Sequence, residues 1–207
     1  MFRDLKGGIE TINRSDSIMT TVYKVSALPV TPDPFTIQKF VALRLLALRT
    51  DPSSFGSTYE REIAFTEEQW RARLSAKSRI TFIASIDQPY DNGIWVATAT
   101  ILAPSDLTFG ALAPLRDVGV GGDIYVLVGM WTMPEHRRRG VGKALIELAV
   151  KWIKMRESKI EDVWLALQVA QGNDVAVEMY TSVGFRTVAT HDTEEGWMIV
   201  PVGEYPF

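Results

Sequence analysis

The sequence contains no cysteine, and its 207 residues include only two histidines, His136 and His191. The missing thiols exclude disulfide bonds, cysteine nucleophiles and zinc sites with thiolate ligands. Because the two histidines lie far apart in the sequence, a histidine-rich metal site is not expected either. We therefore assign no metal ligand.

Long apolar runs and a basic surplus are also missing. No apolar run approaches about 18 residues, so we expect no membrane span. The formal net charge is −3, which argues against general nucleic-acid binding. The N-terminal segment carries acids and lacks the apolar centre of a secretory signal. We expect a cytoplasmic protein with a loose tail over residues 1–19 and a single domain over residues 20–207.

Hydrophobic periodicity predicts one mixed α/β sheet flanked by helices. Strands are expected near residues 22–25, 80–86, 94–102, 124–133, 163–169, 185–189 and 197–200. Helices are expected after Pro34 as far as Asp51, from a Thr66 cap to Ser75, and over residues 141–153 and 173–182. Asp91-Asn92-Gly93 is typical of a hairpin turn, and residues 104–122 are expected to form a long loop.

A basic, glycine-containing stretch follows the expected strand 124–133. Between Glu135 and Lys143 it carries four positive charges against one negative charge. The first turn of a helix presents unpaired N–H groups and the positive end of its dipole, so anions bind there. Gly140 and Gly142 would let the backbone come close to such an anion.

Two known phosphate-binding patterns do not fit this stretch. A P-loop needs glycine where Arg137 stands and a hydroxyl where Ala144 stands. A dinucleotide fingerprint needs glycine or alanine where Leu145 stands. The pattern Arg-x-x-Gly-x-Gly over residues 137–142 remains, and so does the alternative of a solvated basic helix start.

A second motif lies in the expected helix 173–182 and the residues after it. It has the form Asn-x-x-Ala-x-x-x-Tyr-x-x-x-Gly-Phe, from Asn173 to Phe185. Asn173 is a good helix N-cap. Ala176 and Tyr180 share one helical face. Taken alone, Tyr180 would be an ordinary core tyrosine.

Together the two motifs resemble the GNAT superfamily of N-acetyltransferases, and the resemblance extends over roughly residues 22–200. It implies a single mixed, mostly antiparallel sheet flanked by helices. It also implies acetyl-CoA as acyl donor, with Tyr180 as the general acid that reprotonates the CoA thiolate. Backbone at Trp131 and Met133 would bind pantetheine, with an N–H there stabilising the oxyanion. The implied cofactor contacts are completed by Arg137, Arg138, Arg139, Gly140, Val141, Gly142, Lys143 and Asn173.

The acceptor and the general base stay open. The resemblance favours direct acetyl transfer to a primary amine of a small molecule. A protein N-terminus or lysine, or a non-catalytic acyl-CoA-binding module, are the alternatives, and a homodimer is possible. Glu60, Asp123 and Glu194 are weak candidates for the base. A hypothesis for the acidic run Asp192–Glu195 is that it attracts a cationic amine.

Overall fold

The alternating apolar residues form one twisted sheet in the computed structural model, which describes residues 10–16, 19–88, 91–188 and 195–205. Within these ranges the sheet has eight strands in the order β1-β2-β3-β4-β5-β6-β8-β7. Their bounds are β1 Glu10–Asp16, β2 Met19–Ala27, β3 Arg79–Gln88, β4 Asp91–Leu102, β5 Asp123–Thr132, β6 Val163–Ala170, β7 Arg186–Val188 and β8 Glu195–Pro201.

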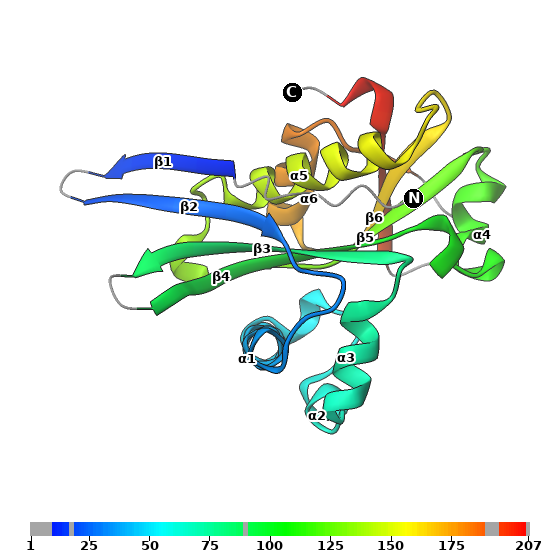
Figure 1. Ribbon diagram of the computed structural model, residues 1–207. Helices are drawn as coiled ribbons and strands as arrows, with labels where there is room; N and C mark the ends of the chain where they lie inside the picture. Colours follow the sequence, from blue (N-terminus) through cyan, green and yellow to red (C-terminus); the bar gives the residue numbers. More distant parts are fainter. Residues whose placement is uncertain (1–9, 17–18, 89–90, 189–194, 206–207) are drawn as a thin grey trace.

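Six α-helices accompany the sheet in the described ranges. They are α1 Pro34–Thr50, α2 Tyr59–Ile63, α3 Glu67–Ser75, α4 Phe109–Asp117, α5 Val141–Arg156 and α6 Asp174–Ser182. Helices α5 and α6 cover one face of the sheet, and α1, α2 and α3 cover the other (Figure 1). Each face has its own buried cluster, with Leu145 and Leu165 in the first and Phe40 and Trp70 in the second.

The sheet is mostly antiparallel, as expected. Among the described strands, β5 and β6 make the one parallel pair, and every other neighbouring pair is antiparallel. Helix α5 makes the crossover between β5 and β6, which a parallel pair requires. The expectation of a mixed sheet flanked by helices is therefore confirmed.

Several details differ from the sequence expectations, among them the short helix α2, which those expectations do not include. Residues 10–16 were expected in a loose tail but form β1, which pairs with β2 from Glu10↔Val25 to Asp16↔Met19. The expected loop 104–122 contains α4, where Thr108 caps the helix and Leu112 and Leu115 are buried. The expected turn residues 91–93 already belong to β4, and residues 89–90 lie outside the described part.

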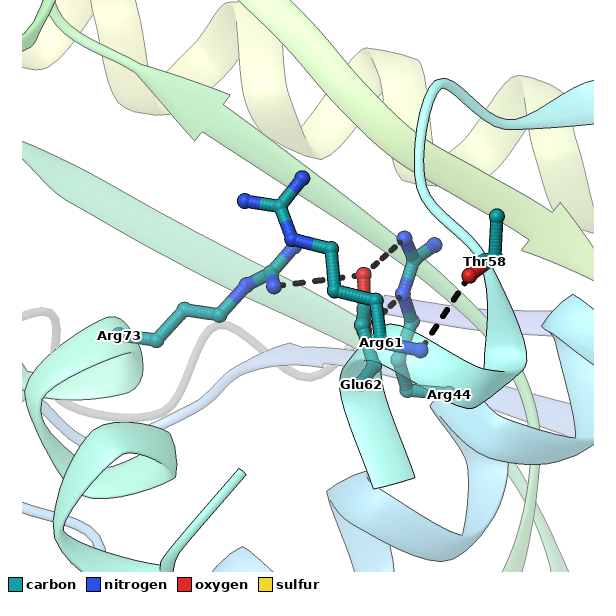
Figure 2. A network of polar contacts seen from close by, with 5 residues as sticks. All are labelled: Arg44, Thr58, Arg61, Glu62 and Arg73. Carbon is teal, nitrogen blue, oxygen red and sulfur yellow. Dashed lines mark hydrogen bonds and ion pairs between the residues drawn. The ribbon is translucent and has the colours of Figure 1, made fainter. Parts of the chain in front are cut away.

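A buried ion pair joins α1 to α2. Arg44 and Glu62 are 5% and 0% exposed, and the Arg44 Nε and Nη2 atoms donate to the Glu62 carboxylate at 2.9 and 2.8 Å. Arg73 of α3 approaches the same carboxylate, with Nη1 3.4 Å from Oε1. Figure 2 shows Arg44 and Arg73 reaching Glu62 from opposite sides. One carboxylate thus links the three helices on this face.

Burial alone would raise the pKa of Glu62, but the hydrogen bonds and charges of Arg44 and Arg73 outweigh it and hold the pKa below its ordinary value. A depressed folded-state pKa stabilises the protein above the unfolded value of about 4.5. That stabilisation is lost as the pH falls through the folded-state pKa. The carboxylate is therefore charged at neutral pH.

We expect Glu62→Gln to lower the free energy of unfolding by about 3 kcal/mol, because it leaves the buried Arg44 guanidinium without a counter-charge. Urea unfolding followed by tryptophan fluorescence at pH 7 measures this. The matched control is Glu67→Gln, which removes an exposed ion pair with Arg71 at 2.7 Å and should cost less than about 1 kcal/mol. Equal losses for the two variants would contradict a structural role of Glu62.

Candidate functional site

Strand β5 parts from β6 halfway along its length. The parallel pairing runs from Asp123↔Val163 to Leu127↔Leu167 and stops there, although β5 continues to Thr132 and β6 to Ala170. On its other side β5 stays paired with β4 as far as Ala97↔Thr132. The second half of β5 therefore has backbone groups on one edge that β6 does not pair, and an extended ligand could occupy that edge.

The backbone of Met133 is not available on that edge. Its N–H donates to Val96 O at 2.8 Å, and its C=O accepts from His136 N at 2.9 Å. Because backbone groups alternate in direction along a strand, the groups of Trp131 also face β4, while those of Thr132 face away from it. Thr132 therefore lies on the free edge, between Trp131 and Met133, the two residues at which the sequence predicts backbone contacts with pantetheine.

The side chain of Trp131 has a structural partner. It is 5% exposed, and its Nε1–H donates to Asp51 Oδ2 at 2.6 Å. Arg137 forms an ion pair with the same Asp51 oxygen, and its Nε donates to Thr132 O at 3.0 Å. Asp51, at the end of α1, thus fixes both the end of β5 and the first arginine of the basic stretch. No local sequence signal indicates this role of Asp51, because Trp131 and Arg137 lie far away in the chain.

The N-terminus of α5 is open. Gly140 is the N-cap with φ +79°, a left-handed conformation, and no side chain caps the helix. The hydrogen bond from Ala144 N–H to Gly140 C=O closes the first turn. The N–H groups of Val141, Gly142 and Lys143 come before it and have no acceptor within the helix. Arg138 is also left-handed, with φ +60°. Such turns point successive N–H groups into an anion-binding concavity.

The two glycines of the basic stretch have different roles. A Cβ on Gly140 would meet nothing within 4 Å, so the conformation and not crowding requires glycine there. A Cβ on Gly142 would lie 2.9 Å from Met130 Cε, so the first turn of α5 packs directly on the Met130 side chain of β5. The side chain of Val141 is buried in the core. Lys143 is exposed and lies 3.8 Å from Glu147.

Helix α6 brings Tyr180 to the free edge of β5. Asn173 caps α6 by accepting from Ala176 N–H at 3.2 Å, which is the structural role expected of it. Tyr180 is 8% exposed, packs on Phe185, and donates its hydroxyl to Met130 Sδ at 3.4 Å. Burial raises the pKa of Tyr180, so the hydroxyl keeps its proton at neutral pH. A thioether is a weak acceptor, which leaves this proton available to a stronger one.

The candidate bases are not gathered at this place. Glu60 is exposed on α2. Asp123 begins β5 and pairs with Val163, nine residues before Thr132 and so roughly 30 Å along the strand. The suggestion that Asp123 is the base is therefore wrong. Glu194 and most of the acidic run lie outside the described residues.

In the described ranges no cluster of three or more histidine or carboxylate side chains could hold a metal ion, and no helix has the length and apolar character needed to cross a bilayer.

The family of the chain follows from comparison with known proteins. The Acetyltransferase (GNAT) family matches residues 42–185. The chain belongs to this family. A curated relative, an uncharacterized N-acetyltransferase of Methanocaldococcus jannaschii, is 32% identical over 65 residues, which are 31% of this chain and 26% of that protein. The match thus spans about a quarter of that relative's length.

Solved structures share the fold. The GNAT domain of S. lividans PAT superposes with a TM-score of 0.66 at 14% identity, covering 93% of this chain and 96% of that one. The ribosomal-protein-S18-alanine N-acetyltransferase of Escherichia coli has a TM-score of 0.52 at 16% identity, with 87% and 94% coverage. AAC(6')-Iy, in complex with a bisubstrate analog that contains CoA, has a TM-score of 0.55 at 17% identity, with 83% and 94% coverage.

We expect Gly140→Ala to weaken binding of CoA about tenfold. An alanine in the left-handed region costs about 1–2 kcal/mol, and relaxing that strain would turn the amides that open α5. Isothermal titration calorimetry with CoA measures the dissociation constant. The matched control is Gly119→Ala, because Gly119 has φ +84°, nothing within 4 Å of its Cβ position, and lies beyond α4. If both variants bound CoA like the wild type, the open helix end would not be the binding site.

Proposed function

We propose that this GNAT acetyltransferase transfers an acetyl group from acetyl-CoA directly to a primary amine of a small molecule. One observation carries the proposal. The unpaired edge of β5, the open N-terminus of α5 and the hydroxyl of Tyr180 meet around Met130. A cytoplasmic location and a homodimer stay predictions from the sequence.

In this proposal the donor lies along the free edge of β5. The pyrophosphate accepts from the amides of Val141, Gly142 and Lys143, and the side chains of Arg138 and Arg139 add positive charge. The pantetheine arm accepts from the Thr132 N–H, in place of Met133, because the Thr132 C=O already accepts from Arg137 Nε. Arg137 and Trp131 hold this edge through Asp51, so their part is to position it. Asn173 acts by fixing the start of α6.

The chemistry needs little more than placement and one proton. The amine nitrogen attacks the thioester carbonyl to form the C–N bond and a tetrahedral oxyanion, and the C–S bond then breaks to release CoA. Backbone N–H groups on β5 stabilise the oxyanion. The Tyr180 hydroxyl, kept protonated by its burial, gives its proton to the leaving thiolate. The attacking nitrogen loses one proton to water, and Tyr180 regains one from water, so the enzyme returns to its starting state. Holding the two reactants together supplies much of the rate enhancement.

The shape of the opposite face supports a small acceptor. A cleft of about 130 Å³ lies between α1, α3 and the sheet, and Val128 and Gly129 of β5 line it. This volume is smaller than the roughly 300–1,000 Å³ of sites for drug-sized ligands, so it favours a small chemical group. The related structures include enzymes whose names give a protein substrate or an analog of acetylneamine, so both acceptor classes occur on this fold.

We expect Tyr180→Phe to lower kcat about 100-fold while leaving the dissociation constant of CoA unchanged, because only the proton donor is lost. Thiol release from acetyl-CoA with a panel of small amines and lysine-containing peptides measures the rate. The matched control is Tyr125→Phe, a second buried tyrosine whose hydroxyl donates to Glu157 away from the site.

Three results would contradict parts of this account. Full activity of Tyr180→Phe would remove Tyr180 from the chemistry. Thiol release with the peptides alone would indicate a protein acceptor and not a small amine. CoA binding without thiol release for any amine would make the chain an acyl-CoA-binding module.

A further inference from the structure

An arginine-lined cleft lies on the sheet face opposite α5, separate from the basic stretch. Its polar wall consists of Arg44, Arg73, Arg79, Thr81 and Thr100, and its volume is about 130 Å³. The Thr81 and Thr100 hydroxyls are 2.8 Å apart and bond each other. None of these arginines lies in the basic stretch 137–142 or in the motif 173–185, so the cleft needs its own explanation.

The cleft keeps one uncompensated positive charge. Glu62 serves both Arg44 and Arg73, and Asp106 pairs with Arg79 at 2.6 Å. Three guanidinium groups therefore face two carboxylates. A ligand with a single negative charge would neutralise the cleft, whereas a dianion would reverse its charge.

Two buried donors in this cleft have no acceptor among the described residues. They are Arg44 Nη1 and Arg79 Nε. Arg44 is 5% exposed, and its Nη1 points away from Glu62 in Figure 2, where it carries no dashed line. A buried charged donor without an acceptor costs free energy, and such groups are rare in native proteins. A ligand oxygen would satisfy them.

The cleft reaches β5 at the point where β5 leaves β6. Gly129 follows the last paired residue, Leu127, by two positions and has φ +61°. Arg44 Nη1 lies 3.7 Å from the place that a Cβ on Gly129 would take. Met130, whose Sδ accepts from the Tyr180 hydroxyl, comes directly after Gly129, so the cleft and the proposed position of the leaving thiolate adjoin neighbouring residues of β5, roughly 3.3 Å apart along the strand. A short aliphatic chain can span that distance.

We propose that this cleft binds the carboxylate of the acceptor, so that the acceptor is an aminocarboxylate whose amine extends toward β5. The inference rests on the proposed function, since it names the substrate class of that same site. The reaction is the acetyl transfer proposed above: the amine gains the acetyl group, CoA leaves as the thiol, and the carboxylate of the acceptor is unchanged. A carboxylate matches the single excess charge and accepts from Arg44 Nη1 and Arg79 Nε.

The test compares amines that differ by one carboxylate. Lysine and γ-aminobutyrate are the acids, and cadaverine and propylamine are the same molecules without the carboxylate. Thiol release gives kcat and KM for each in the presence of acetyl-CoA. For whichever of the two acids is the better substrate, we expect a KM at least tenfold below the KM of the same molecule without its carboxylate. Equal values, or a lower KM for the decarboxylated amines, would overturn the inference.

The double variant Arg44→Met/Glu62→Leu tests the assigned residues. Replacing both members of a buried ion pair by apolar residues of similar size usually preserves the fold. We expect at least a tenfold rise in KM for the acids, with little change for cadaverine or propylamine and for the affinity of CoA. Arg79→Gln is a second variant, in β3 at the same cleft, and we expect the same rise in KM for the acids alone. The matched control is Arg71→Gln, since Arg71 pairs with exposed Glu67 on α3.

Calorimetry separates this inference from the proposed function. N-acetyl-lysine and inorganic phosphate are titrated into the protein saturated with CoA. If the wild type binds N-acetyl-lysine, the double variant does not, and no amine gives thiol release, the carboxylate site in the cleft is supported and the proposed enzyme activity is rejected. If thiol release occurs and the double variant has the wild-type KM for every amine, the enzyme activity is supported and the carboxylate site in the cleft is rejected. Phosphate binding in preference to N-acetyl-lysine would also reject a carboxylate subsite.

Discussion

The parting of β5 from β6 after Leu127 is the constraint on which the site depends. A parallel pair needs a crossover helix, and here the crossover is α5, whose N-terminus begins beside the unpaired half of β5. The unpaired edge has to be satisfied by a ligand or by water, because backbone groups are obligatory hydrogen-bonding groups. Tyr180 approaches the same edge from α6 and contacts Met130. The opening in the sheet thus determines where the donor, the proton source and the acceptor can meet.

Two irregularities accompany this opening. The register of β4 and β5 shifts between Thr98 and Thr100, and Gly129 on β5 is left-handed. A bulge bends a strand and increases its twist, which turns the second half of β5 away from β6. The bulge also brings Gly129 to the face where Arg44 lies. One local distortion therefore shapes both the proposed donor edge and the proposed acceptor cleft.

Much of the fold could be predicted from periodicity and capping. The Thr66–Gln69 capping box and the helix after Asn173 occur where the sequence indicates them, because these signals are local. Strand β1 could not be predicted, since ETINRSD has little apolar alternation and its pairing depends on β2. Helix α4 contains Gly110 and Pro114, which weaken the local signal, and the packing of Leu112 and Leu115 outweighs them.

The candidate site was predictable only where a motif marks it. The direction of backbone groups at Trp131 and Met133 depends on the register with β4, which the sequence does not reveal. The burial of Arg44 could not be predicted because arginine is rarely buried, although Arg44 lies four residues after buried Phe40 and four before buried Leu48. Its partner Glu62 comes from another helix, so only the tertiary structure shows the pair.

A crystal structure of the protein with CoA tests the central claim most directly. The account predicts the pyrophosphate within hydrogen-bonding distance of the Val141, Gly142 and Lys143 amides, and the pantetheine arm paired with the Thr132 backbone between β5 and β6. Pantetheine elsewhere on the surface, or a closed β5–β6 edge with the phosphates held only by exposed arginines, would contradict it.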